Sequence, residues 1–231
     1  MLHFSLSRYL LLILLLSMSG VTSAQKSLHF PEGWKVEDSS GVLEITERGD
    51  TLELVVPDGL TLWYKQRLTG DYEIRYRICM VMKGGKYDRL SDLNCFWAAN
   101  DPQYPANLFA RSDWRKGVFQ HYNTLDLFYV GYGGNENSTT RFRRYSGKYY
   151  GVDENRIKPL LAEYTDAPNL LYPNRWYAVC IQVKEGITTF SVDEKELFRY
   201  TLAPNQGDGH FALRLLQNHV LFTNFQVKTL K

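Results

Sequence analysis

Apolar and polar residues alternate along much of this chain with the period of a β-strand, and this pattern constrains the fold more than any other feature. In segment 72–78, every second residue from Tyr72 to Ile78 is apolar, and the residues between them are charged. Successive side chains of a strand point to opposite faces, so the segment predicts a strand with one face in the core. The same alternation occurs over residues 92–97 and 176–183, and further strands are expected at 52–56, 188–192, 211–215 and 221–227.

The expected strands are short, and turns containing glycine and proline separate them. Segment 188–200 is expected to form a hairpin that turns at residues 193–195. No long segment has the period of an α-helix. Many short strands with turns between them favour a sandwich of two antiparallel sheets. We therefore expect an all-β jelly roll.

The first 24 residues have the composition of a secretory signal peptide. Arg8 precedes an apolar run at residues 9–16, and small residues lead to Ala24, after which cleavage is expected. The run is shorter than the roughly 20 residues that a transmembrane helix needs. We therefore expect residues 25–231 to form a single jelly-roll domain that is periplasmic or secreted, with no membrane span after removal of the signal.

Positive charge is concentrated in one part of the chain. The whole chain has a formal net charge of +2, whereas segment 111–149 contains seven basic and three acidic residues. A local excess of this kind favours a site for an anionic ligand over a general affinity for nucleic acid. The cysteines Cys79, Cys95 and Cys180 lie in strand-like segments without metal-binding spacing, so buried thiols are expected.

Two sets of segments resemble known families. Segments 175–183, 188–200, 209–214 and 220–227 resemble the closing strands of concanavalin A-like lectin/glucanase domains, in which the final strand pairs near the N-terminal one. Segments 92–102, 129–135 and 139–145, with Asn218-His219, resemble a family of secreted bacterial jelly-roll proteins and are similar to YesU-type proteins associated with rhamnogalacturonan utilisation. This resemblance implies a setting of polysaccharide degradation and supplies no catalytic residue.

Arg141 and Arg143 are the strongest candidates for ligand binding. With Phe142 anchored in the core, both guanidinium groups project from one face of their strand. Two such groups repel each other unless an anion or acidic side chains lie between them, and a planar guanidinium fits a carboxylate. A uronic acid is therefore the expected ligand. The alternative is a structural network with Asp88, Asp92 or Asp126. The other candidate substrate-binding residues are Asp92, Asn94, Asn135, Tyr145 and His219.

A lyase-type β-elimination is the expected reaction if the protein cleaves its ligand. The uronate carboxylate must be neutralised, and a base must remove the neighbouring proton, a role for His121, Tyr122 or Tyr132 beside the arginines. A hydrogen-bonded structural histidine is the alternative for His121. A glycoside hydrolase of this fold would need two carboxylates, and only Asp92 lies on a suitable strand. A non-catalytic carbohydrate-binding module would use the same binding residues, and an exported scaffold protein is a further alternative.

No cofactor is expected, with calcium as the one exception that the residues leave open. Asp88, Asp92 and Asp101 are candidate calcium ligands, but their spacing matches no calcium-binding loop. The expected partner is an acidic polysaccharide or oligosaccharide, and neither nucleic acid nor a membrane is expected as a partner.

Overall fold

The structure, a computed structural model, describes residues 30–230, and the expected signal peptide at residues 1–24 lies outside them. The described residues form mainly strands, as predicted. The strands are β1 (Trp34–Asp38), β2 (Glu44–Arg48), β3 (Thr51–Tyr64), β4 (Tyr72–Met80), β5 (Leu93–Asn100), β6 (Asp126–Gly133), β7 (Thr139–Tyr145), β8 (Leu160–Tyr164), β9 (Trp176–Lys184), β10 (Ile187–Val192), β11 (Lys195–Thr201) and β12 (His210–Thr229).

The helices are short and lie in the connections. They are η1 (Leu108–Arg111), α1 (Ser112–Arg115), η2 (Phe119–Thr124), α2 (Gly134–Asn137), η3 (Gly147–Tyr149), α3 (Glu154–Ile157) and η4 (Ala167–Asn169), where η denotes a 3₁₀ helix. Between residues 30 and 230, no helix combines the length and the apolar character that crossing a membrane requires.

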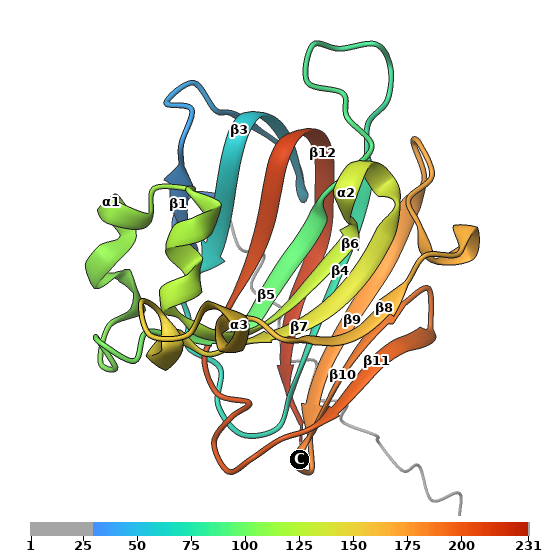
Figure 1. Ribbon diagram of the computed structural model, residues 1–231. Helices are drawn as coiled ribbons and strands as arrows, with labels where there is room; N and C mark the ends of the chain where they lie inside the picture. The colour runs from blue at the N-terminus through green and yellow to red at the C-terminus, as the bar shows by residue number, and fades with distance from the viewer. Residues whose placement is uncertain (1–29, 231) are drawn as a thin grey trace, which may run out of the picture.

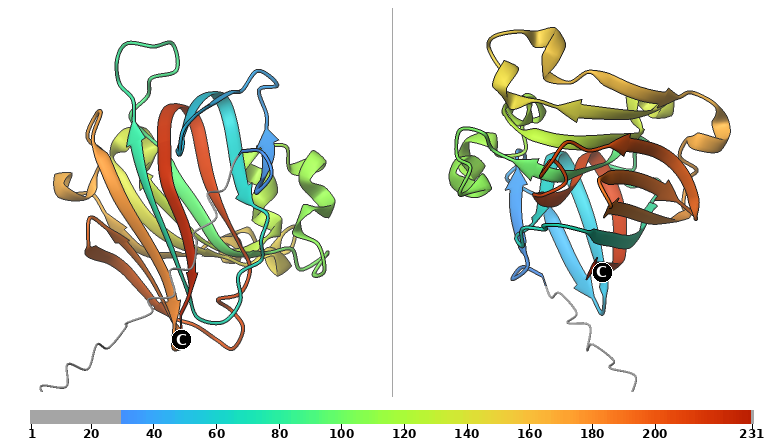
Figure 2. Two further views of the ribbon diagram at one scale, coloured as in Figure 1. Left: turned by 180° about the vertical axis from the view of Figure 1, so that it is seen from behind. Right: turned by 90° about the horizontal axis from the view of Figure 1, so that it is seen from below.

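The strands pack as two antiparallel layers, which we call the front sheet and the back sheet (Figures 1 and 2). The order in the front sheet is β1, β3, β12, β5, β6, β7 and β8. The order in the back sheet is β2, β3, β12, β4, β9, β10 and β11. Strands β3 and β12 belong to both sheets. The predicted jelly-roll sandwich is therefore confirmed.

Strand β12 passes from the front sheet into the back sheet. The sequence predicts two strands in this region, but the structure has one, which pairs first with β5 and then with β4. The register shifts between Leu216 and Asn218 and again after Thr223, and the φ angle is 53° at both Gln217 and Asn224. An extra residue in one strand of a pair bends that strand and increases its twist. These two bulges let one continuous strand serve both layers.

The core between the sheets is rich in aromatic rings. Trp97 of β5 stacks on Phe142 of β7 with ring centroids 5.7 Å apart, and its indole N–H donates to Thr188 Oγ1 of β10 at 2.9 Å. A buried indole N–H needs a partner, and here that partner comes from the opposite sheet. Burial of one large apolar side chain contributes about 1.5–3 kcal/mol, so such contacts hold the two layers together.

Residues 101–125 connect β5 to β6 and form a cap over part of the outer face of the front sheet (Figure 1). Left-handed φ angles of 41° at Lys116 and 75° at Gly117 turn the chain after α1. The chain then enters η2 at Phe119. A second apolar cluster fills the space below the cap, with Trp63 and Phe96 from the sheet.

A buried ion pair fixes the cap to β1. Arg115 of α1 donates to Glu37 of β1 at 2.8 Å, and both side chains are fully buried. Ser112 Oγ and Tyr122 Oη also donate to the Glu37 carboxylate, at 2.7 and 2.6 Å. Buried charges are tolerated when they are paired and their hydrogen bonds are complete. The network therefore holds the cap in one position on the sheet.

Candidate ligand-binding groove

Two adjoining hollows lie on the outer face of the front sheet beside the cap. The deep hollow has a volume of about 390 Å³ and lies between the cap and strands β3, β12 and β5. The open hollow has a volume of about 250 Å³ and lies over β6 and β7. Asp92, Phe119 and Tyr129 line both hollows, so the two form one continuous depression, which we call the groove.

The floor of the groove is set by the pairing register of the front sheet. Cross-strand neighbours place one residue from each strand side by side: Glu37, Thr61, Arg214, Asn94, Gly131, Arg141 and Glu163. We call this line the polar row. A parallel aromatic row contains Trp63, Ala212, Phe96, Tyr129 and Arg143. The cap covers much of the aromatic row, whereas the middle of the polar row opens into the groove.

Arg141 and Arg143 share the groove face, as the alternation predicts, and Phe142 between them is in the core. In the structure, the two arginines have different hydrogen-bond and ion-pair partners from those considered in the sequence. Arg141 forms an ion pair with Glu163 of β8, in place of the aspartates considered from the sequence. Arg143 donates to the backbone oxygen of Lys158 at 2.7 Å and has no carboxylate partner among the described residues.

Lys158 is a second cation of the open hollow. Its ammonium group lies 5.5 Å from the centroid of the Phe119 ring. Burial lowers the pKa of Lys158 and the nearby charge of Arg143 lowers it further, while the carboxylate of Glu154 partly opposes the shift. An alternation pattern could not reveal Lys158, because it lies in the irregular segment between α3 and β8. The unneutralised positive charge of the open hollow therefore comes from Arg143 and Lys158.

Four further candidates from the sequence also line the groove. Asp92 lies between the two hollows, Asn94 lines the deep hollow, and Asn135 and Tyr145 line the open hollow. Asp92 forms an ion pair with Arg89 at 2.8 Å. Its φ angle is 61°, and that of Asn135 is 52°. Such left-handed conformations cost about 1–3 kcal/mol each in a residue other than glycine and gather at functional sites.

The candidate catalytic residues do not line the groove. His121 stacks on Trp114 of the cap with centroids 4.0 Å apart. Tyr122 is buried under the cap, and burial and the Glu37 carboxylate raise its pKa. Tyr132 points into the core, because its neighbour Gly131 takes the groove face. The structure thus does not bring a histidine or tyrosine base beside Arg141 and Arg143 in the predicted way.

His219 also lies away from the groove. Its ring nitrogens contact Glu53 at 2.9 Å and Asp88 at 3.1 Å. Asp88 in turn accepts hydrogen bonds from two backbone N–H groups of its own loop, those of Lys83 and Gly85. His219 thus connects the loop before β5 to the β3 and β12 strands of the back sheet.

The candidate calcium ligands do not converge. Asp88 is bound to His219, Asp92 to Arg89, and Asp101 to Arg111 of the cap at 2.7 Å. Across residues 30–230, no group of three or more histidine, cysteine, aspartate or glutamate side chains is arranged to hold a metal ion.

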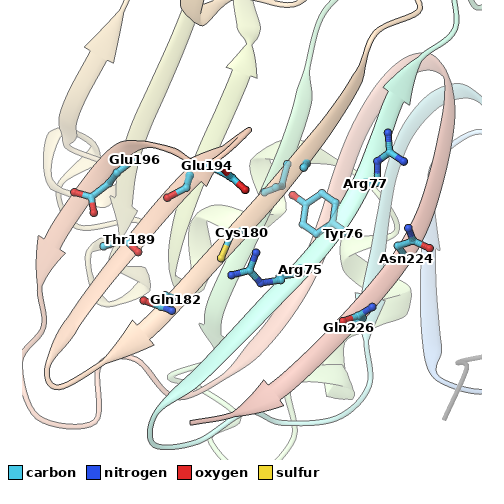
Figure 3. Close-up of a pocket in the computed structure, with 13 residues that line it drawn as sticks. Arg75, Tyr76, Arg77, Cys180, Gln182, Thr189, Glu194, Glu196, Asn224 and Gln226 are labelled. Carbon is cyan, nitrogen blue, oxygen red and sulfur yellow. The ribbon is translucent and has the colours of Figure 1, made fainter. Parts of the chain in front are cut away.

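A larger hollow of about 640 Å³ lies on the outer face of the back sheet, and Figure 3 shows the side chains that line it. It is the polar, solvent-facing side of an antiparallel sheet. Glu73 engages both Arg75 and Gln182, and Glu196 accepts from Arg199. The groove on the front sheet instead places cations without a carboxylate partner among residues 30–230 beside aromatic rings, so it is the better candidate site.

Solved structures with this fold include several proteins with carbohydrate-related descriptions. A protein of unknown function with a galectin-like fold from Bacillus subtilis is 16% identical, with a TM-score of 0.64 over 86% of this chain and 90% of that one. The carbohydrate-binding module CBM66 from Bacillus subtilis is 12% identical, with a TM-score of 0.54 over 85% and 96%. An endo-β-1,3-glucanase from Pyrococcus furiosus is 10% identical, with a TM-score of 0.54 over 87% and 90%.

The structural similarity to these proteins shows a shared jelly-roll fold. Because the sequence identities are low, the activity must be argued from the groove. No curated protein matches the chain in sequence. Residues 54–225 match a family described as a domain of unknown function, DUF6250. The match spans most of the chain and most strands of both sheets, so the protein belongs to the DUF6250 family.

Proposed function

We propose that this protein is an exported carbohydrate-binding protein whose groove holds an acidic saccharide. The observation that carries the proposal is the composition of the open hollow. Arg143 and Lys158 lie there without a carboxylate partner among residues 30–230, next to the aromatic rings of Phe119 and Tyr145. Cationic groups bind a carboxylate, and aromatic rings with amide and carboxylate side chains suit a pyranose.

Two further considerations support this class of ligand. The solved structures with the same fold include a carbohydrate-binding module and a glucanase. The sequence resemblance to YesU-type proteins favours a uronate-containing plant polysaccharide such as rhamnogalacturonan. The expected signal peptide places the protein in the periplasm or outside the cell, where such polymers are found.

Binding titrations with polygalacturonate, its methyl-esterified form and a neutral galactan test the proposal. We expect the acidic polymer to bind most tightly and its affinity to fall with salt, because esterification and salt both weaken pairing with Arg143. Arg143→Gln should reduce this affinity. Arg144→Gln is a matched control, since it removes the same charge from the next position, outside the groove. Equal binding of neutral and acidic polymers would contradict the acidic ligand.

A lyase-type β-elimination is a second candidate function, and the environment of Lys158 favours it. Burial and Arg143 lower the pKa of Lys158, which increases the fraction of neutral amine that can remove a proton. In this reaction Arg143 neutralises the uronate carboxylate, and Lys158 takes the proton from the adjacent carbon. The electron pair of the broken C–H bond forms a double bond as the C–O bond to the leaving sugar breaks, and the leaving oxygen takes a proton from water.

Ultraviolet absorbance of that conjugated double bond tests the lyase. We expect absorbance to rise during incubation with polygalacturonate, and Lys158→Met should abolish the rise, with binding weakened but still measurable through Arg143. New reducing ends without absorbance would indicate hydrolysis instead. Saturable binding with neither product would identify a non-catalytic binding module.

A further inference from the structure

Arg214 of β12 is a buried cation without a counter-charge in contact. Its exposed fraction is 3%, and it lies between the rings of Phe119 and Tyr122, with centroids 5.3 and 5.6 Å from the guanidinium carbon. Arg214 forms no hydrogen bond or ion pair with the part of the chain that the structure describes, and its Nη1 is fully buried. Burial lowers its pKa, and nearby groups, among them the carboxylates of Asp92 and Asp58, oppose this shift. An unpaired buried charge is costly, so a protein that retains one has a use for it.

The neighbour of Arg214 in the polar row is unsatisfied as well. Asn94 lies directly opposite on β5, its exposed fraction is 5%, and its side-chain oxygen has no hydrogen-bond partner among residues 30–230. Nearly all buried polar atoms in proteins have a partner, so two unsatisfied cross-strand neighbours are unusual. Arg214 supplies donors and Asn94 supplies an acceptor, and both line the deep hollow.

The space above Arg214 is built from backbone. A Cβ atom on Gly59 would lie 3.0 Å from both terminal nitrogens of the guanidinium and 2.2 Å from the Gly117 oxygen, so the backbones of Gly59 and Gly117 pack directly beside Arg214. Residues 117–120 of the cap form the facing wall. The volume of about 390 Å³ is within the range of small-molecule pockets.

Two carboxylates also line the deep hollow, and neither binds Arg214. Asp92 is paired with Arg89, and Asp58 is exposed to solvent. Their oxygens can accept hydrogen bonds from the hydroxyl groups of a sugar. The deep hollow therefore offers donors at its floor and acceptors around them.

We infer that the deep hollow is a second acidic subsite, in which Arg214 binds the carboxylate of one uronic acid residue. A ring hydroxyl of the same residue donates to the side-chain oxygen of Asn94. This inference rests on the proposed function and adds to it, since Arg143 and Lys158 occupy the open hollow on the other side of Tyr129. The groove would then bind two acidic residues of one saccharide chain, one in each hollow.

Calorimetric titration of wild-type and variant proteins with galacturonate, galactose and a galacturonate oligosaccharide tests the subsite. Arg214→Lys keeps the charge but loses the planar fork, and we expect it to weaken oligosaccharide binding at least tenfold. Wild type should bind galacturonate in preference to galactose. Galactose 6-sulfate tests whether the subsite prefers a carboxylate or a sulfate. Tighter binding of galactose 6-sulfate than of galacturonate would overturn the carboxylate assignment.

Asn94→Asp keeps the test informative if Arg214→Lys folds poorly. The new carboxylate is the cross-strand neighbour of Arg214, so we expect it to raise the thermal midpoint and to weaken galacturonate binding by occupying the guanidinium. Asn135→Asp, in the open hollow, is the matched control and should not raise the midpoint. A destabilised Asn94→Asp that binds galacturonate normally would overturn the inference.

The subsite and the proposed function can fail separately. If the oligosaccharide binds and Arg143→Gln weakens it but Arg214→Lys does not, the subsite alone is refuted. If wild type binds none of the saccharides, the proposed function is refuted, and the subsite falls with it.

Discussion

Gly59 of β3 and Gly117 of the cap face each other with no room for a side chain on either. A Cβ atom on Gly59 would lie 2.2 Å from the Gly117 oxygen, and one on Gly117 would lie 2.3 Å from the Gly59 oxygen. The cap thus meets the sheet backbone against backbone at the edge of the deep hollow.

Gly117→Ala should lower the free energy of unfolding more than strain in the backbone alone explains. Gly117 has a φ of 75°, and a side chain in this conformation costs about 1–2 kcal/mol. The collision with Gly59 adds to this. Gly151→Ala is the matched control, because Gly151 has a φ of 73° and a Cβ atom there would meet no other atom within 4 Å. Urea denaturation measures both, and equal losses would contradict the close contact.

Glu37→Gln should destabilise the protein strongly. The substitution removes the carboxylate that Arg115 contacts at 2.8 Å and leaves Asp101, 3.7 Å away, as its remaining counter-charge. Breaking a buried pair costs about 3–5 kcal/mol. Glu196→Gln removes the exposed partner of Arg199 and should cost far less, because solvent screens an exposed pair. Chemical denaturation of the two variants gives the comparison, and similar losses would show that the cap network contributes little.

His210 should make the protein less stable in mild acid. Burial lowers the pKa of this histidine, Arg67 lowers it further, and its Nδ1 lies 3.2 Å from the backbone oxygen of Tyr64. The unfolded chain therefore binds this proton at a higher pH than the folded chain, and stability falls as the pH drops below about 6.5.

Thermal midpoints of wild type and His210→Asn across this pH range check the prediction. The variant should lose less stability between about pH 8 and pH 5, because it has no proton to take up. The difference between the two thermal midpoints at the higher pH measures the packing that is lost with the imidazole ring, because both proteins are then uncharged at this position. Parallel pH curves would show that His210 is not responsible.

Gly131→Ala should impair ligand binding more than Gly134→Ala. A Cβ atom on Gly131 would lie 2.5 Å from the Tyr129 hydroxyl oxygen, so the ring that separates the two hollows must move. The nearest atom to a Cβ on Gly134 is 3.7 Å away, which is an ordinary contact. Both glycines line the open hollow. Titration with an acidic oligosaccharide measures the effect, and equal affinities would place the ligand away from Tyr129.

Much of the fold follows from the alternation of residues, because a strand with one buried face leaves that pattern in its sequence. The same rule correctly places Asn94 and Arg143 on an outer face and Phe142 in the core. It does not show what covers an outer face. The cap buries Tyr122, and its turn at Lys116 and Gly117 depends on tertiary contacts that no local pattern records.

The importance of Arg214 is hidden in the sequence for a related reason. It occupies an outward position next to Ala212 on β12, where an ordinary surface arginine would also be expected. Only the register of β12 against β5, and the cap above it, make it buried and leave it without a partner among the described residues. Likewise, Glu163 is distant in sequence, so its ion pair with Arg141 follows from strand pairing alone.

The groove crosses the strands, and this bears on the length of the ligand. Three strand spacings separate β12, which carries Arg214, from β7, which carries Arg143. At about 4.8 Å for each spacing, the two backbones are roughly 14 Å apart. A ligand that engages Arg214 and Arg143 together must therefore run across the strands, and we expect an oligosaccharide to gain more affinity from the groove than a single sugar.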